Sequence, residues 1–347
     1  MASLRIGYLS QVPDMSHPAD RRRLVYWAQK RGHNITQDLN SPVDVIFLAG
    51  RSDFAKVGEY QAKAPVIIDL IDGYLGNENP IVDLARGIGK IGTSQLSGNP
   101  KKYSTVLSQA IAQADATICA SVEQNIPISK ITNNSHIILD FHEEFPFIPF
   151  SEKSSKPKQL LWEGQAFTAD GLKALEKVLV QIMQKEPIAL NLVTDLESPR
   201  ILGRFGKKST INRVGKLPKI LGQNFALTPW SIPNVISSAH NSLVSIIPLD
   251  PRNVLNPLKP ENRLLIMWRL GLPCLTSRTL AYERVMKDAE LDSICKTDHE
   301  WQSKLEEFIS SPSIRRNNVQ KGQAYIHEKH NEVETLKRWD KAVESVL

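Results

Sequence analysis

Cysteine is scarce in this sequence, which has three cysteines, Cys119, Cys274 and Cys295, among 347 residues. The count is odd and no two of them form a Cys-x-x-Cys pair. The sequence therefore supports neither a disulfide framework nor a zinc site, and we expect a protein of the reducing cytoplasm.

Long apolar runs are also absent. The first residues, Met-Ala-Ser-Leu-Arg-Ile-Gly-Tyr-Leu, lack the apolar core of a secretory signal. No run reaches the length of about 18 apolar residues that a membrane-spanning helix needs. We expect a protein that is neither secreted by a standard signal nor inserted across a membrane. The glycosylation sequons at Asn34 and Asn133 are then incidental.

Several catalytic signatures are missing as well. The sequence contains no Asp-x-Asp, no His-Glu-x-x-His, no Gly-x-Ser-x-Gly and no P-loop. Its net charge of +6 is spread along the chain and forms no basic tail. We therefore expect no metal site and no nucleic-acid partner.

What is present is a repeated alternation of short apolar segments with helical segments. Apolar residues make up 41% and charged residues 23% of the chain, as in globular proteins, and the length suits two domains. This alternation predicts an α/β protein with parallel sheets covered on both faces. In the first half, the predicted strands are 4–9, 43–48, 66–70 and 116–120, and the predicted helices are 19–31 and 103–113.

The pattern restarts after a stretch rich in proline, serine and lysine at 146–157, which is typical of a linker. Strands are predicted at 159–163, 189–194 and 245–248, with a helix at 169–184 and an amphipathic helix at 331–346. We assign 1–150 to an N-terminal domain, 151–158 to the linker, 159–328 to a C-terminal domain and 329–347 to a final helix.

The most informative segment lies at 246–281. A strand ends near Pro248, a polar loop carries Lys259, and Pro260 opens a helix whose free backbone N–H groups favour an anion. Because ligands bind beyond the carboxyl ends of strands in open α/β sheets, this loop is a candidate binding site. The alternative is that Lys259 is a solvated loop lysine.

This segment resembles the nucleotide-sugar-binding segment of GT-B-fold glycosyltransferases, in particular the retaining family 4, or group 1, type. The resemblance implies two Rossmann-like domains facing a cleft, with the acceptor on the N-terminal domain and the donor on the C-terminal one. It also implies that the last helix crosses back to pack on the N-terminal domain. It is carried by Lys-Pro-Glu-Asn-Arg at 259–263 and Gly-Leu-Pro at 271–273, and supported by 66–72, 114–121 and 160–164.

The resemblance also implies a donor site. Lys259 and Asn262 would meet the donor diphosphate, helped by backbone amides near Glu261. Further phosphate charge would come from a Gly-flanked loop, although for its residues a solvated surface role is the favoured alternative. The residues assigned to this site are Lys259, Glu261, Asn262, Arg263, Arg204, Lys207 and Gly164.

Two positions depart from the family pattern. Ile266 stands where many members carry a glutamate that binds the nucleotide ribose. The loop at 10–18 lacks the adjacent glycines that approach the donor phosphates in many members. Ribose recognition must therefore differ or be absent, and phosphate contact by this loop is not expected.

Candidate catalytic groups follow two predicted strands. His17 lies in the loop after the first strand, and Asp69 and Asp72 lie at and just after the end of the third. A surface loop position for His17, and helix capping or a structural turn for the two aspartates, are the alternatives. Without a metal, lysine, arginine and helix dipoles would stabilise the leaving diphosphate.

The sequence thus indicates a cytoplasmic glycosyltransferase that uses a nucleotide-sugar, UDP- or GDP-linked, and needs no further cofactor. Its acceptor would be a glycan, a lipid-linked intermediate or a small molecule. The basic run Arg21–Arg23 is compatible with peripheral contact with an anionic membrane at its inner face. A non-catalytic GT-B-like binding subunit and a sugar-nucleotide epimerase are the alternatives, and the oligomeric state stays open.

Overall fold

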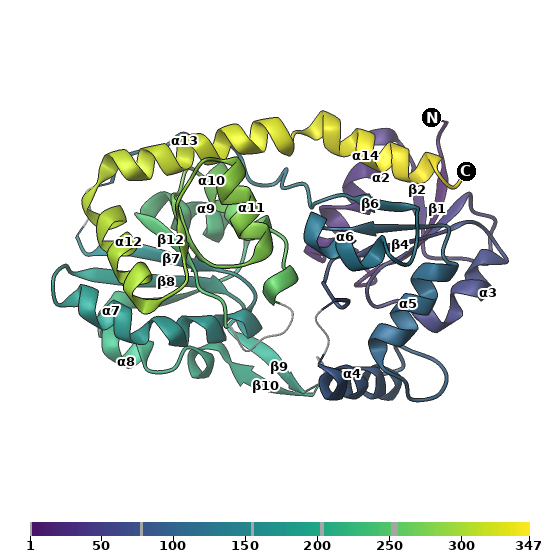
Figure 1. Cartoon of the computed structure of the whole chain (residues 1–347), viewed down its shortest axis with the longest axis horizontal. Helices are drawn as coiled ribbons and strands as arrows, with labels where there is room; N and C mark the ends of the chain where they lie inside the picture. Colours follow the sequence, from purple (N-terminus) through teal and green to yellow (C-terminus); the bar gives the residue numbers. More distant parts are fainter. Residues whose placement is uncertain (1, 77–78, 154–155, 202–204, 251–255) are drawn as a thin grey trace. The chain divides into compact units, whose positions relative to one another are not determined.

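A computed structural model describes residues 2–76, 79–153, 156–201, 205–250 and 256–347. The chain forms two compact units, each built around a parallel sheet (Figure 1). The first unit comprises Met1–Phe141, Leu258–Pro260 and His330–Leu347, and the second His142–Pro257 and Glu261–Lys329.

The first unit contains a six-stranded parallel sheet in the order β2-β1-β3-β4-β5-β6. Alternate residues of its central strands enter two different cores: Val45 and Phe47 pack on one face, Ile46 and Leu48 on the other. Burial on both faces explains why these strands are continuously apolar, and it confirms the predicted parallel sheet. The strands are β1 (Arg5–Leu9), β2 (Asn34–Thr36), β3 (Val45–Leu48), β4 (Val66–Leu70), β5 (Ala116–Cys119) and β6 (Ser135–Ile137).

The helices of the first unit cover both faces of this sheet. The helix predicted at 19–31 is instead two helices, because the backbone leaves helical geometry at Arg23 (φ −123°, ψ −111°). The second of them ends, as predicted, at Gly32 in the left-handed conformation (φ 71°). The helices are α1 (Pro18–Arg21), α2 (Leu24–Arg31), α3 (Val57–Gln61), α4 (Pro80–Gly92), α5 (Tyr103–Gln113), α6 (Val122–Ile128) and α14 (Glu332–Glu344).

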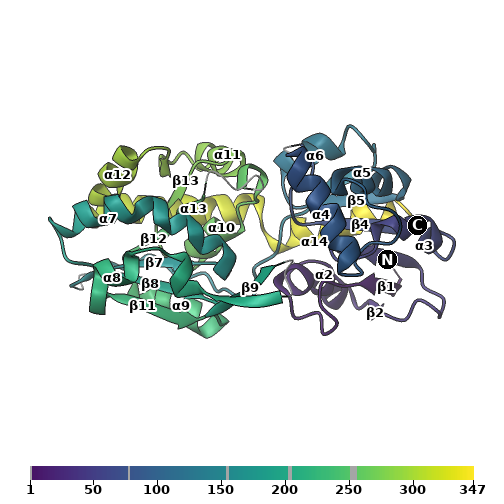
Figure 2. The same cartoon turned by 90° about the horizontal axis from the view of Figure 1, so that it is seen from below.

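The C-terminal helix α14 belongs to the first unit and lies beside α2 (Figures 1 and 2). Trp339 is fully buried, with its ring 6.0 Å from that of Trp27 and 6.2 Å from that of Phe47. Asp340 accepts hydrogen bonds from the Trp27 indole at 2.8 Å and from Arg31. The expectation that the last helix returns to the N-terminal region is therefore confirmed.

The second unit contains another six-stranded parallel sheet, in the order β11-β8-β7-β12-β13-β14. An antiparallel pair, β9 and β10, was not predicted. The strands are β7 (Lys158–Glu163), β8 (Ile188–Thr194), β9 (Glu197–Ile201), β10 (Phe205–Ser209), β11 (Phe225–Pro229), β12 (Val244–Ile247), β13 (Cys274–Ser277) and β14 (Ile294–Cys295).

The helix predicted at 169–184 begins as a 3-10 helix, Ala166–Leu175, and becomes α-helical only in α7. A Cβ atom at Gly171 would lie 2.4 Å from the carbonyl oxygen of Pro248, so this segment passes close to the backbone after β12. None of the described helices is long and apolar enough to cross a membrane. The α-helices are α7 (Glu176–Met183), α8 (Leu217–Leu221), α9 (Ile232–Asn241), α10 (Asn262–Arg269), α11 (Leu280–Asp288), α12 (Asp298–Ser310) and α13 (Pro312–Lys329).

Candidate functional site

The carboxyl end of β7, a central strand of the second sheet, carries a buried carboxylate. Glu163 ends this strand and is 7% exposed. One of its oxygens accepts a hydrogen bond from the Trp230 indole at 2.8 Å, while the other, Oε2, makes none among the described residues. Gly164 follows with φ 154°, a conformation that favours glycine.

Arg263, in the first turn of α10, lies against this strand end. Its guanidinium carbon is 4.9 Å from the centre of the Trp162 ring, and its Nε is 3.8 Å from Glu163 Oε2. A Cβ atom at Gly164 would come within 3.0 Å of the guanidinium, so glycine permits this approach. Nε and Nη2 of Arg263 are buried and make no hydrogen bond within the described ranges. The site therefore holds a cation with donors available for an anion.

Two other predicted residues adjoin Arg263 at the start of α10. The Glu261 side chain is buried and accepts a hydrogen bond from Arg284 at 3.0 Å. It gives no side-chain cap to the helix. Asn262 Oδ1 is buried and has no hydrogen-bond partner in the described part of the chain, whereas its carbonyl oxygen is 3.2 Å from His142 Nε2. The first turn of α10 thus leaves backbone N–H groups without a side-chain cap.

The remaining predicted donor-site residues are placed differently. Lys259 is half-buried and lies in the three-residue stretch that belongs to the first unit. Lys207 lies on β10, and Arg204 lies outside the described residues. Among the predicted donor residues, the structure therefore brings together Gly164, Glu261, Asn262 and Arg263.

Ile266, which stands where many family members have glutamate, is buried in α10. Its side chain is 2% exposed, so an apolar residue fits this position. Sequence reasoning missed Glu163 and Arg284 as members of the site. The position of Glu163 at a strand end was the available signal, but nothing in the sequence indicates that Arg284 pairs with Glu261.

Asp69, a predicted catalytic group of the first unit, forms a buried ion pair with Arg23. The Arg23 Nε donates to Asp69 Oδ2 at 2.9 Å and Nη2 to Oδ1 at 2.5 Å. A further hydrogen bond joins Arg23 to the Ile138 carbonyl at 2.7 Å, and Asp140 lies 3.1 Å away. Burial raises the pKa of Asp69, and the guanidinium opposes that rise. This arrangement favours a structural role for the ion pair between Arg23 and Asp69. A catalytic role for Asp69 stays a prediction.

The same pair corrects the interpretation of 21–23 as a basic surface segment. Arg23 is fully buried and Arg22 is 7% exposed, which leaves Arg21 as the half-exposed member of the run. The prediction of a membrane-facing arginine run is wrong, because the break between α1 and α2 turns Arg23 into the core toward Asp69.

The other two predicted catalytic residues lie in loops at the carboxyl edge of the first sheet. His17 is half-buried and caps α1, since its Nδ1 accepts a hydrogen bond from the Ala19 amide at 3.2 Å. Burial lowers the pKa of His17 and favours a neutral ring at neutral pH. Asp72 accepts a hydrogen bond from the Tyr74 hydroxyl at 2.9 Å. His17 thus caps a helix and Asp72 takes part in a local turn. Catalytic roles for both residues stay predictions.

Sequence reasoning also missed a basic group on α4. The Lys90 ammonium lies 4.7 Å from the centre of the Tyr103 ring and donates to the Gly50 carbonyl at 3.3 Å. Burial lowers the pKa of Lys90 to about 8, with further lowering by Arg51 and Arg86. Arg51 lies in the loop just after β3, and its place in the sequence could have indicated a basic group at the carboxyl edge of this sheet.

Metal ligands do not gather in the described ranges, where no three His, Cys, Asp or Glu side chains could hold an ion together. The cysteines, Cys119, Cys274 and Cys295, are buried and unbonded to one another.

Comparison with known proteins was made by sequence and by structure. No protein-family model and no curated protein matches the sequence. Among solved structures, TarM of S. aureus is similar with a TM-score of 0.62 and 10% identity over 92% of this chain. The match spans 57% of the TarM chain, so this protein corresponds to little more than half of it.

Two further structures match over nearly their whole length. WaaG, a glycosyltransferase involved in lipopolysaccharide biosynthesis, has a TM-score of 0.58 and 13% identity, with 99% of both chains covered. A glycosyltransferase from Rickettsia africae has a TM-score of 0.59 and 9% identity, covering 100% of this chain and 99% of the other. With two parallel six-stranded sheets and a last helix that returns to the N-terminal region, the chain has the GT-B fold of glycosyltransferases.

Proposed function

We propose that this protein transfers a sugar from a nucleotide-sugar to an acceptor. The observation that carries the proposal is the guanidinium of Arg263, which lies beside Glu163 and Gly164 with buried donors that make no hydrogen bond among the described residues. The carboxyl edge of a parallel sheet is where ligands of α/β proteins bind, and the GT-B fold supports this choice of chemistry.

On this proposal, charge stabilisation is the main task of the site. The nucleoside diphosphate leaves with growing negative charge, and Arg263 together with the uncapped first turn of α10 would hold it. Glu163 Oε2, which is buried without a hydrogen-bond donor in the described part of the chain, would accept a hydrogen bond from a hydroxyl of the donor. Lys259, Lys207 and Arg204 remain proposed contributors to the diphosphate contact.

The finer assignments belong to the same proposal. Residues 1–150 would receive the acceptor and 159–328 the donor, joined by the linker 151–158, with 329–347 as the returning helix. His17 and Asp72 are the proposed groups on the acceptor side. Structures of S. aureus TarM and of pneumococcal GtfA contain UDP, so UDP-sugars come first among the donors to test, followed by GDP-sugars. Retention of stereochemistry is proposed by analogy with the fold.

The first test is a thermal-shift screen with UDP, GDP and their sugar conjugates. A nucleotide present at about 100 times its Kd should stabilise the protein by about 2.7 kcal/mol and so raise its Tm. The variant Arg263→Ala should show no such rise in Tm. Arg278→Ala is the matched control, because Arg278 is an exposed arginine of the same unit, 57% exposed and paired with Glu283. Its rise in Tm should equal that of the wild type.

Failure of every nucleotide to raise the wild-type Tm would contradict the proposal. The buried Ile266 would then favour a non-catalytic GT-B-like subunit, since a ribose-binding glutamate is missing there. A second measurement distinguishes a transferase from an epimerase: conversion of the nucleotide-sugar is followed with and without an acceptor. An epimerase would convert the nucleotide-sugar with no acceptor present. Transfer is supported only if product formation requires the acceptor.

A second prediction concerns divalent metals. If Arg263 and the helix amides stabilise the leaving diphosphate, EDTA should leave the rate of sugar transfer unchanged, and added Mg²⁺ should not raise it. The rate is measured with the donor that the thermal-shift screen identifies. A complete loss of transfer in EDTA that Mg²⁺ restores would show the expectation to be wrong.

A further inference from the structure

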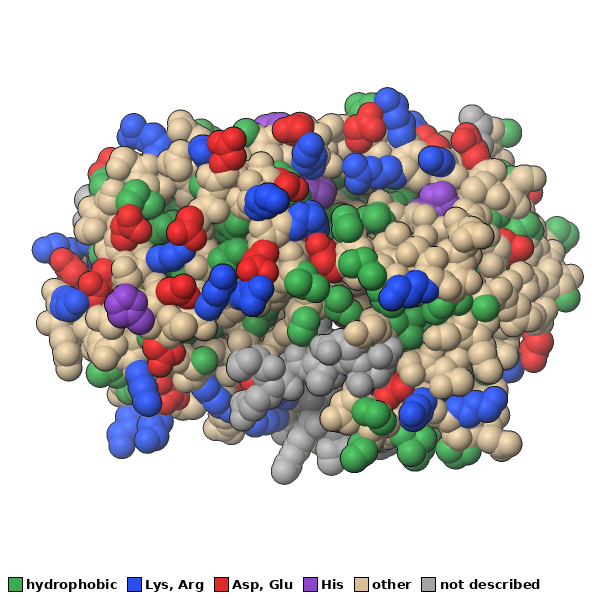
Figure 3. All heavy atoms as spheres, viewed as in Figure 1, with side chains coloured by type: hydrophobic (Ala, Val, Ile, Leu, Met, Phe, Trp, Pro, Cys, Tyr) green, Lys and Arg blue, Asp and Glu red, His purple; other side chains and the backbone are tan. Residues whose placement is uncertain are grey.

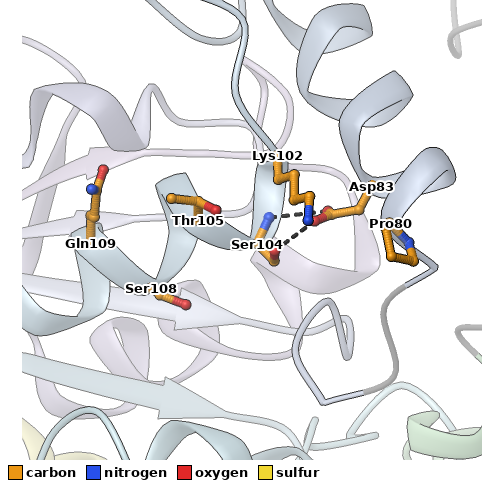
Figure 4. A pocket seen from close by; sticks show the side chains of 7 residues that line it. All are labelled: Pro80, Asp83, Lys102, Ser104, Thr105, Ser108 and Gln109. Carbon is orange, nitrogen blue, oxygen red and sulfur yellow. Dashed lines mark hydrogen bonds between the residues drawn. The ribbon is translucent and has the colours of Figure 1, made fainter.

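Helix α4 turns a polar side toward the interior of the first unit. Ile81 and Ile88 are 81% and 50% exposed, and hydrophobic side chains lie at the surface over this helix (Figure 3). Asp83 is buried and points toward Ser104 at the start of α5 (Figure 4). It accepts hydrogen bonds from the Ser104 amide at 3.0 Å and from the Ser104 hydroxyl at 2.5 Å. The side of α4 that carries Asp83 therefore faces the protein.

Two cations follow Asp83 on this inward side of α4. With 3.6 residues per turn, Arg86 and Lys90 lie about one and two turns further along the helix. The Arg86 guanidinium lies over the Tyr74 ring, 5.1 Å from its centre, and the Lys90 ammonium lies 4.7 Å from the centre of the Tyr103 ring. The two rings are 5.2 Å apart and meet edge to face. This aromatic pair therefore holds both cations at one place in the unit.

A third cation comes from the loop after β3. Lys90 donates a hydrogen bond to the Gly50 carbonyl at 3.3 Å, and the next residue, Arg51, is exposed. Burial lowers the pKa of Lys90, and Arg51 and Arg86 lower it further, so the three positive charges interact with one another. None of the three forms an ion pair within the described ranges. Arg51, Arg86 and Lys90 therefore form a cationic cluster.

One carboxylate faces this cationic cluster. Asp72 opposes the lowering of the Lys90 pKa, and it accepts a hydrogen bond from the Tyr74 hydroxyl at 2.9 Å. The Tyr103 hydroxyl is fully buried and makes no hydrogen bond in the described part of the chain. Cations removed from water cost free energy unless anions compensate them. The cluster thus has an excess of positive charge that an anionic ligand would balance.

The cationic cluster adjoins the groups that we propose for the acceptor side. The pKa of His17 is lowered by burial, and among nearby charges Arg51 lowers it and Asp72 raises it. Arg51 and Asp72 are therefore neighbours of both His17 and Lys90. These groups follow strands at the carboxyl edge of the first sheet, where ligands of open α/β sheets bind. An acceptor bound beside His17 would meet the cationic cluster.

We propose that Arg51, Arg86 and Lys90 bind a phosphate group of the acceptor. A phosphate ester has three terminal oxygens and a charge of about −1.5 to −2 at pH 7, so each cation can donate to an oxygen. A carboxylate suits the cluster less well, because it has two oxygens and a single charge. The phosphate belongs either to a phosphorylated sugar or to a lipid phosphate. That this ligand is the acceptor rests on the proposed function, whereas phosphate binding itself does not.

Ligand-observed NMR titrations of the full chain, without any nucleotide, test the site. The probes are glucose 6-phosphate, geranyl phosphate, glucuronate and glucose. At least one of the two phosphates should bind about tenfold more tightly than glucuronate, and glucose should not bind measurably. Both phosphates are monoesters of similar charge. Tighter binding of glucose 6-phosphate would support a phosphorylated sugar as the source, and tighter binding of geranyl phosphate would support a lipid phosphate.

Variants locate the binding on the cluster. Arg51→Ala/Arg86→Ala should raise the Kd of the phosphate at least about tenfold, because charge-assisted hydrogen bonds are lost. Lys90→Met should act in the same direction and serves as the second variant if the first fails to fold, which its Tm would show. The matched control is Arg5→Ala/Lys130→Ala, which removes the same charge from exposed positions that precede β1's core residues and β6. This control should bind as the wild type does.

Three results would overturn the proposal. They are absence of phosphate binding by the wild type, unchanged binding by folded cluster variants, and an equal loss of binding in the control. Loss of phosphate binding in Arg263→Ala would also overturn it, because the phosphate would then occupy the proposed donor site. If no nucleotide raises the wild-type Tm while the cluster still binds phosphate, sugar transfer fails and the phosphate site stands. The opposite pair of results would leave the proposed function and remove this site.

Discussion

Arg23→Met should lower the free energy of unfolding by about 3–5 kcal/mol, the range seen when one partner of a buried ion pair is removed. Arg23 is fully buried and holds both oxygens of Asp69. Without the guanidinium, that carboxylate stays in the core with its charge uncompensated. Denaturant unfolding at neutral pH measures the loss.

The pH dependence of this loss has a defined sign. Burial raises the pKa of Asp69, and removing Arg23 removes the interaction that opposes the rise. Lowering the pH protonates the buried carboxylate in the variant and relieves its unpaired charge. The difference in the free energy of unfolding between the wild type and Arg23→Met should therefore become smaller as the pH falls.

Two comparisons make the test specific. Arg21→Met, at the half-exposed arginine two positions away, should change stability by no more than about 0.5 kcal/mol. Arg23→Met/Asp69→Leu should recover part of the loss, because it removes both charges of the pair. A single Arg23 variant as stable as the Arg21 control would show that the pair contributes little.

Trp339→Ala should destabilise the first unit by about 3–5 kcal/mol, since a fully buried tryptophan leaves a large cavity. The lost ring packs on Trp27 and Phe47, which join α2 and β3 to α14. Hydrogen exchange is the measurement of choice because it resolves the units. Amides of β1 and β3 should exchange faster in the variant, and those of β7 and β8 should not change.

The control lies on the same helix. Val333 is 61% exposed, so Val333→Ala should leave the exchange of β1 and β3 near the wild-type rate. Equal acceleration in both units would mean that α14 does not stabilise the first unit selectively. No acceleration with Trp339→Ala would contradict the packing described for this helix.

Strands buried on both faces were the most predictable parts of the fold. The segment 66–70 is apolar except for Asp69, and β4 has the same bounds. A short apolar run between turns is enough to indicate a strand buried on both faces, without any periodicity. The helix predicted at 103–113 also has the bounds of α5. Local composition determines such elements strongly, so a single sequence is sufficient for them.

Elements that depend on a distant partner were not predictable. The break at Arg23 coincides with the pairing of its side chain with Asp69, which is far along the chain. The orientation of α4 depends on Asp83 meeting Ser104, and the helical pattern alone predicts the opposite face buried. In the donor region, Gly164 and Arg263 were named from local motifs, but the Arg284 contact with Glu261 needs the folded structure.

The position of α14 has a consequence for how the protein is made. The first unit takes its last core residues, including Trp339, from a helix that the ribosome synthesises after the whole second unit. Domains made first usually fold first, but here the N-terminal sheet must wait with part of its apolar surface uncovered until α14 emerges. The second unit, whose strands all precede α14, has its sheet available earlier. During synthesis, the nascent N-terminal unit is thus the part exposed to aggregation and to chaperone binding.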